Sequence, residues 1–335
     1  MDTLVLAETN PESRADALSS LAVGFRTRFK QTGDRNDLDL SIKHHEEALK
    51  LRPEGHPDRA VSLSHLAIDH FMLFEQTKGR QDLDISIKYY EEALEVWPEG
   101  HNNRAISLLN LAISLRSRFK MIGDLDDLDM SIKHDEEVLK ARPEGHPNRA
   151  VSLSNLAVGL RTRFNQTGDR MDLDMGIRHD KEALKLQPDG HPNRAASLGN
   201  LAVDLWTRFK DTGDIRDLDL NIRHQQAALK LWPEGHPDRA GSIFNLAVSL
   251  RTRFKQTRDG SDLDLSIEHN QEALKLQPMG HPLRATSLSH LAFNFTDRFA
   301  QTADREDLLS SLRLAREGAA HESSPAIVRF KASLL

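Results

Sequence analysis

Asparagine recurs at one register of this sequence, at intervals of 45 residues and always before Leu-Ala. We call this register the Asn row, and its four amides are Asn110, Asn155, Asn200 and Asn245. The other copies place here Ser20, His65 and His290. An amide offers both a donor and an acceptor, so it matches the two polar groups of a peptide unit. That unit belongs either to a bound chain or to a neighbouring helix, and both readings stay open.

A row of arginines follows six residues after the Asn row. This first Arg row consists of Arg26, Arg116, Arg161 and Arg251. It is interrupted by Phe71, Trp206 and Thr296. Repeated guanidinium groups would attract the carboxylates or phosphates of a ligand. The alternative is ion pairing within the protein, with acidic residues such as Asp172 or Asp174 on an adjacent helix.

A second Arg row lies two residues further on, and here we expect structural pairing with those acidic residues. Its members are Arg28, Arg118, Arg163, Arg208, Arg253 and Arg298. The second copy departs from both rows, because it reads Phe71-Met72-Leu73-Phe74 where others read Arg-Thr-Arg-Phe. It also holds Tyr89 and Tyr90, the only tyrosines. Aromatic and methionine-rich surface anchors partners, so the second copy predicts either a specificity pocket or a locally repacked core.

Six histidines follow glycine at the same 45-residue interval and resemble a metal signal. They are His56, His101, His146, His191, His236 and His281. Stacked helices lie about 8–10 Å apart, so equivalent side chains cannot share an ion through bonds of about 2 Å. We therefore expect these histidines to fix turns, and we expect no metal and no other cofactor. There is no cysteine and no glycine-rich phosphate loop after a strand, so the sequence indicates a non-enzymatic protein.

The elements that carry these rows are best seen in the copy from Pro143 to Gln187. Apolar residues at helical spacing predict a first helix, helix A, of about 18 residues that ends at Thr167-Gly168. Pro147 suits its first turn. Asp169 is expected to cap the second helix, helix B, with Asp172 completing a capping box. An alanine recurs midway along every helix A, and we expect close helix packing there rather than mere helix propensity. A fixed period of this length indicates a stacked-repeat protein.

These residues resemble tetratricopeptide (TPR) repeats. Leu153, Leu156, Ala157 and Leu160 sit at TPR signature positions, and HPNRAVSLSNLA resembles the opening of kinesin-light-chain-type TPRs. Two features depart from the TPR pattern. The period is longer than usual, and the aromatic expected midway along helix B is mostly replaced by polar residues such as Asp180.

The resemblance implies a fold and a mode of binding. The implied fold is an all-α, right-handed α-solenoid of seven helix-turn-helix repeats. In TPRs of this type the A helices line a concave face, where an Asn hydrogen-bonds the backbone of a bound peptide. The resemblance therefore favours peptide contact for the Asn row, with Phe71 and Trp206 filling apolar pockets. Similar arrays are attached to CHAT peptidases and to NLR-type immune receptors.

The expected domain organisation is one solenoid over residues 8–322. A lead covers 1–7, and a partial helix forms a stub over 323–335. The seven repeats are expected at 8–52, 53–97, 98–142, 143–187, 188–232, 233–277 and 278–322. The sequence leaves open whether the chain is a segment of a larger protein.

Composition limits the partners. The formal net charge is −6, and no cluster of Lys and Arg predicts nucleic-acid binding. No signal peptide or membrane helix is apparent, so we expect a cytoplasmic protein with no membrane partner. The expected partner is a protein or peptide segment, and an acidic one fits the first Arg row. The sequence therefore predicts a non-enzymatic scaffold; the alternative is a regulatory array of a CHAT-peptidase or NLR-type protein separated from its effector.

Overall fold

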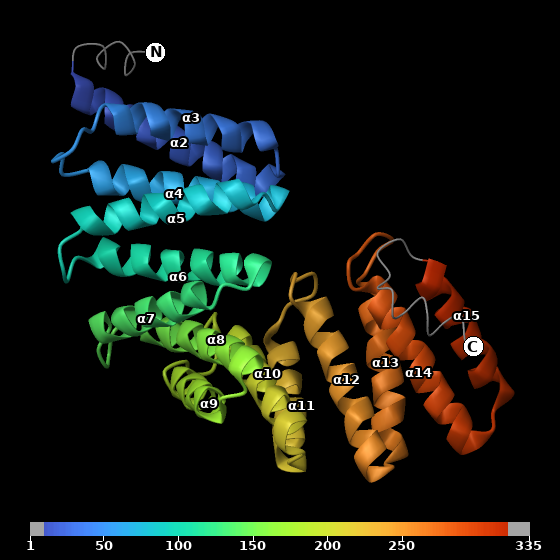
Figure 1. The fold of residues 1–335 in the computed structure, drawn as a ribbon. Coiled ribbons are helices and arrows are strands. Elements are labelled where there is room, and N and C mark those ends of the chain that lie inside the picture. Colours follow the sequence, from blue (N-terminus) through green and yellow to red (C-terminus); the bar gives the residue numbers. More distant parts are fainter. Residues whose placement is uncertain (1–9, 321–335) are drawn as a thin grey trace. The chain divides into compact units, whose positions relative to one another are not determined.

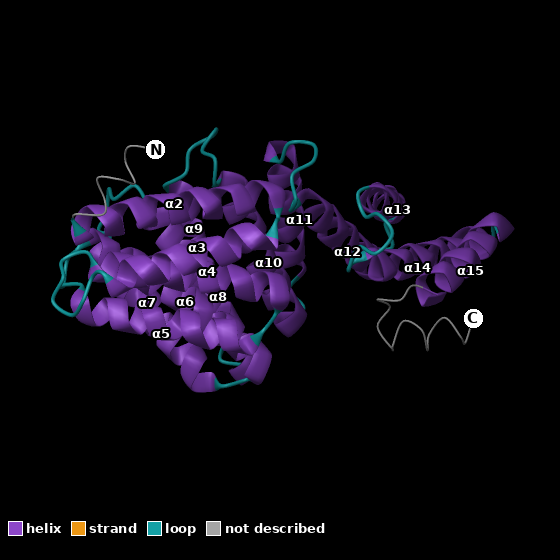
Figure 2. Cartoon of the chain, turned by 90° about the horizontal axis from the view of Figure 1, so that it is seen from above, coloured by secondary structure: helices purple, strands orange, loops and turns teal. Residues whose placement is uncertain are grey.

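The computed structural model describes residues 10–320 and confirms an all-α array of TPR-like helix pairs. Between these residues fourteen helices follow one another without a strand (Figures 1 and 2). Their bounds are α2 (Pro11–Thr32), α3 (Arg35–Lys50), α4 (Arg59–Thr77), α5 (Arg80–Val96), α6 (Asn102–Ile122), α7 (Leu125–Ala141), α8 (Arg149–Thr167), α9 (Arg170–Lys185), α10 (Arg194–Thr212), α11 (Ile215–Leu231), α12 (Arg239–Thr257), α13 (Gly260–Lys275), α14 (Arg284–Thr302) and α15 (Arg305–Ala320). The even-numbered helices are the A helices, and the odd-numbered helices are the B helices.

The chain divides into two compact units, residues 1–172 and 173–335. In the first unit the pairs α2/α3, α4/α5 and α6/α7 pack tightly, and each B helix also packs on the next A helix. The second unit repeats this order from α10 to α15. The predicted lead, 1–7, and the predicted stub, 323–335, lie outside the described residues. None of the described helices is long and apolar enough to cross a membrane.

The turn between helix A and helix B forms largely as predicted. Gly168 ends α8 in the left-handed conformation, with φ of 74°, and its N–H bonds to the carbonyl oxygen of Phe164. Asp169 accepts a hydrogen bond from the N–H of Met171 at 2.9 Å, as a capping residue does.

Two details of the predicted helix starts are wrong. The capping box does not form, because Asp172 binds Arg163 and the N–H of Asp169 bonds to the Thr167 hydroxyl instead. Pro147 lies in the turn before α8 rather than in its first turn, because that turn is closed by His146.

The recurrent alanine marks a close contact between the two helices of a pair, as expected. Every copy is at most 2% exposed: Ala22, Ala67, Ala112, Ala157, Ala202, Ala247 and Ala292. In four pairs a polar side chain of helix B donates a hydrogen bond to the carbonyl oxygen of this alanine. These donors are Ser41 at 3.0 Å, Ser86 at 2.8 Å, Asn221 at 2.6 Å and Ser266 at 2.7 Å. A larger side chain at the alanine would push the donor away, so close packing explains the residue better than helix propensity.

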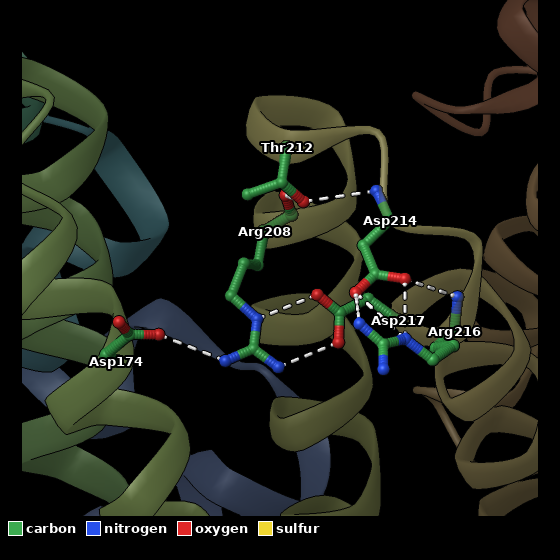
Figure 3. Close-up of polar contacts among 6 residues, drawn as sticks. All are labelled: Asp174, Arg208, Thr212, Asp214, Arg216 and Asp217. Carbon is green, nitrogen blue, oxygen red and sulfur yellow. Dashed lines mark hydrogen bonds and ion pairs between the residues drawn. The ribbon is translucent and has the colours of Figure 1, made fainter.

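The second Arg row makes the structural pairs that the sequence predicted. Arg208 shows the arrangement, which we call the Arg–Asp staple (Figure 3). Its Nε and Nη2 each donate to one oxygen of Asp217 in the paired helix α11, both at 2.7 Å. Its Nη1 donates to Asp174, in the preceding helix α9, at 3.0 Å. One guanidinium therefore ties the A helix to its own B helix and to the B helix before it.

The staple recurs along both units. The two-oxygen pairs are Arg28–Asp37, Arg118–Asp127, Arg163–Asp172, Arg208–Asp217, Arg253–Asp262 and Arg298–Asp307. All but the first add a bond to an aspartate 34 residues earlier. These hydrogen bonds raise the pKa of each arginine, so its guanidinium stays protonated. The second repeat has Leu73 in place of the arginine and lacks the staple.

We predict that the two aspartates of a staple contribute unequally to stability. The Asp217 side chain is 6% exposed, so Arg208→Gln leaves a buried charge without its partner and should cost about 2–4 kcal/mol. The Asp174 side chain is 53% exposed, so Asp174→Asn should cost less than about 1 kcal/mol. Urea unfolding followed by circular dichroism measures both. Adding Asp217→Asn to Arg208→Gln should recover part of the loss, and equal small effects of all variants would contradict the account.

Candidate peptide-binding surface

Two members of the Asn row line one hollow in the second unit. This hollow of about 460 Å³ lies between α10 and α12, and its wall includes Asn200, Val203 and Asn245. Gly199 and Gly241 also line it and leave its sides without side chains. Asn200 is half-buried and Asn245 is exposed. Neither amide side chain bonds to another described residue, so both keep a donor and an acceptor for a ligand.

A smaller hollow of about 140 Å³ adjoins the first, because Val203, Asn245 and Gln225 line both. Trp206 and Val248 form its apolar side. Trp206 is half-buried, and its ring lies 5.8 Å from that of Phe209 within the core cluster of α10, α11 and α12. The predicted apolar anchor and the Asn row therefore share one surface in this unit. We call the two hollows together the amide hollow.

Helix α11 supplies polar groups to the amide hollow that the sequence analysis did not assign. Asn221 donates its Nδ2 hydrogen to the Ala202 carbonyl oxygen, and its buried Oδ1 has no hydrogen-bond partner among the described residues. Gln225 is buried one turn further on. Gln225 stands where TPRs carry the helix B aromatic, so the departure was visible in the sequence. That this polar residue lines a hollow follows only from the structure.

The Asn row is used differently in the first unit. Asn110 hydrogen-bonds the side chain of Tyr90 in α5. This amide therefore bonds to a neighbouring helix, which was one of the two possibilities left open by the sequence. Burial raises the pKa of Tyr90 well above its usual range, so its hydroxyl stays neutral. Asn155 is half-buried on α8. In the second unit His290 contacts the Phe244 ring edge-on at 5.1 Å.

His65 completes the row in the first unit and sits among positive charges. Its ring lies 4.9 Å from that of His45, and its backbone oxygen is 3.5 Å from Arg26 Nη1. Burial lowers the pKa of His65 to about 4, with help from His45, Arg26 and Arg52, while Asp69 opposes the shift. The ring is therefore neutral at physiological pH and can take part in hydrogen bonds as a donor and an acceptor.

The structure places three members of the first Arg row in ion pairs within the array. Arg26 binds Asp69 at 3.2 Å, Arg116 binds Asp135, and Arg251 binds Asp297 at 2.7 Å. Arg161 is half-buried on α8. Internal pairing was the alternative reading of this row, but the partners differ from those expected, Asp172 and Asp174. Aspartate recurs at the Asp69 register as Asp204 and at the Asp135 register as Asp180, whereas Asp297 occurs once.

The departures of the second repeat form mainly a core. Leu73 and Tyr90 are buried, near Phe74, whose phenylalanine every repeat shares. Phe71 is half-buried and lies 5.8 Å from the Phe74 ring, against the cluster formed by α4, α5 and α6. Two of the departures, Leu73 and Tyr90, therefore form part of a locally altered core, and Phe71 remains partly exposed.

The six Gly-His histidines fix turns, as expected. In each, Nδ1 accepts a hydrogen bond at 3.1–3.2 Å from the backbone N–H two residues later, at the start of the next helix A. This bond requires an unprotonated Nδ1. Within residues 10–320 no three His, Asp or Glu side chains are grouped to hold a metal ion.

The fold recurs in solved structures of other proteins. No family model matches the chain, and no curated protein is similar to it in sequence. The C-terminal part of a TPR repeat-containing protein from Cytophaga hutchinsonii is 9% identical, covers 92% of this chain and 98% of its own, and gives a TM-score of 0.55.

Two further structures show the same kind of array. The human IFIT1 dimer with m7Gppp-AAAA is 18% identical, with 99% of this chain and 65% of that chain covered and a TM-score of 0.58. BtubC (BKLC) from P. vanneervenii is 18% identical, with 70% of this chain and 90% of that chain covered and a TM-score of 0.50. At these identities the likeness defines a fold. That fold is the TPR array that the sequence resemblance predicted.

We predict that His65 makes the first unit less stable in mild acid. With a pKa near 4 in the folded state and about 6.5 when unfolded, His65 takes up a proton mainly on unfolding between these pH values. The unfolding free energy should therefore fall as pH is lowered through this range, by on the order of 2–3 kcal/mol in all. His65→Asn keeps a row amide and removes the titrating ring. Its unfolding curves should lose that part of the pH dependence, and parallel slopes for both proteins would contradict the assignment.

Proposed function

We propose that this chain is a non-enzymatic TPR scaffold that binds an extended protein segment along the exposed face of its A helices. The amide hollow of the second unit is the principal site. The observation that carries the proposal is the pair of unbonded amides, Asn200 and Asn245, beside Trp206 in one hollow. Main-chain N–H and C=O groups of an extended segment would bond to the amides, which gives affinity without regard to sequence.

The apolar and polar walls of the hollow would contact different groups of the ligand. Trp206 would contact an apolar side chain of the segment, because a half-buried tryptophan offers a large rigid surface at little cost in entropy. The unbonded Oδ1 of Asn221 would accept one further hydrogen bond from the ligand. A buried acceptor of this kind gains most from being paired, because leaving it unpaired costs about 1–3 kcal/mol.

A protein segment fits this surface better than a nucleic acid. Binding to phosphates needs a stripe of available Lys and Arg. Here the second Arg row and Arg26, Arg116 and Arg251 of the first already hold carboxylates of the array. Net charge of −6 adds no attraction. The IFIT1 structure carries m7Gppp-AAAA, so a capped RNA oligonucleotide is the informative competitor in the test.

We predict that the two amides affect nearly every bound peptide, whereas Trp206 affects only some. Asn200→Ala with Asn245→Ala removes both amides and keeps helix propensity. On an array of tiled peptides, followed by fluorescence anisotropy of those that bind, this double variant should weaken most of them by about tenfold or more. Trp206→Ala should weaken only peptides with an apolar residue at one fixed place.

The matched control is Asn165→Ala, which removes an exposed amide of α8 outside the Asn row and should change nothing. Wild-type affinity of the double variant would overturn the proposal. Failure of every peptide, with binding of capped RNA, would also overturn it. Peptides that bind independently of these residues would instead favour the regulatory-array alternative, whose contacts lie on the ends and the outer face.

A further inference from the structure

A second hollow lies in the first unit, where α6 and α8 begin, and a buried arginine lines it. Its volume is about 780 Å³, and its wall includes Arg104, Ile106, Lys140 and Arg142. Arg142 follows the end of α7 and is only 5% exposed. Its guanidinium makes one hydrogen bond, from Nη1 to the Ser152 hydroxyl at 2.8 Å. No carboxylate of the described residues forms an ion pair with it.

Arg52, two repeats earlier, shows what Arg142 lacks. Arg52 makes the equivalent bond, from Nη1 to Ser62 at 2.7 Å. It also bonds to Ser19 and forms an ion pair with Asp16 of α2. The Asp16 side chain is 63% exposed, so its carboxylate reaches Arg52 from the solvent side.

The two residues that would complete the set around Arg142 are apolar. Counting 90 residues on from Ser19 and Asp16 gives Leu109 and Ile106. Ile106 is exposed and lines the same hollow as Arg142. In the intervening repeat, the residues equivalent to Arg52 and Asp16 are both apolar. They are Trp97 and Val61, which pack together. At this register of the described repeats, the third alone sets a buried arginine beside an apolar residue.

The charges around this hollow favour an anion. Arg104, Lys140 and Arg142 face two carboxylates, Glu99 and Glu137. Arg104 already holds Glu137, through Nη2 at 3.2 Å. Burial without a partner lowers the pKa of Arg142, which marks a cation that lacks a counter-charge. A carboxylate arriving from solvent would supply it by a charge-assisted hydrogen bond.

We propose that Arg142 is a recognition site for an Asp or Glu side chain of a bound protein segment. That carboxylate takes the place beside Arg142 that Asp16 takes beside Arg52, and the apolar face of Ile106 contacts the methylene carbons of the same side chain. The acidic specificity expected from the first Arg row thus falls to an arginine outside it. This site does not depend on the amide hollow, which lies in the other unit.

The test uses Ile106 because one substitution closes the site and its isostere does not. Ile106→Asp builds the internal pair of the first repeat, whereas Ile106→Asn removes the same apolar group and leaves Arg142 open. The probe is N-acetylglutamate α-amide, with N-acetylglutamine α-amide as the neutral control. Binding is followed in the full chain by the NMR signal of the Arg142 Nε–H group.

The glutamate probe should shift this signal saturably in the wild type and in Ile106→Asn. The glutamine probe should not, and Ile106→Asp should weaken glutamate binding by about tenfold or more. Asn200→Ala with Asn245→Ala should leave the shift unchanged, so failure here is distinguishable from failure of the amide hollow. No saturable shift, or equal shifts in Ile106→Asp and Ile106→Asn, would overturn the proposal. Inorganic phosphate that displaces the glutamate probe at lower concentration would also overturn it, by marking a phosphate site.

Discussion

The array depends on an aspartate in the first turn of each B helix, which is buried in six of the seven and half-buried in α5. In six of the seven pairs an arginine of the A helix binds both of its oxygens. A buried carboxylate without such a partner is strongly unfavourable, so this pairing fixes where the A helix crosses the B helix. The third bond of the same guanidinium, to the preceding repeat, fixes how one pair stacks on the next. Local and inter-repeat geometry therefore rest on one side chain.

Because the staple and the recurrent alanine fix the backbone, the remaining positions can differ between repeats. The proposed recognition surfaces follow from those differences. At the end of helix B the chain reads Arg52, Trp97, Arg142, Gln187, Trp232 and Gln277 in successive repeats. The two hollows show the effect, since Trp232 lines the amide hollow and Arg142 lines the hollow of the first unit. Nearly identical repeats thus present chemically distinct surfaces on a common frame.

Periodic features were predictable from the sequence, and single-repeat features were not. The helix pairs, Gly168, the histidine turns and the second Arg row follow from interactions that recur every 45 residues. The partner of Arg251, Asp297, lies 46 residues away, at a register where no other repeat has an aspartate. The same holds for Asn110, whose bond to Tyr90 depends on the only repeat with a tyrosine there. The hollows also depend on how neighbouring A helices diverge, and no residue pattern encodes that directly.

In the proposed function, unbonded amides on the A helices receive the main chain of a partner. A crystal structure of the chain with an affinity-selected peptide tests it most directly. We expect the side chains of Asn200 and Asn245 each to bond to main-chain N–H or C=O groups of the peptide, with Trp206 against one of its apolar side chains. A peptide seated elsewhere, with both amides turned onto their own helices, would contradict it.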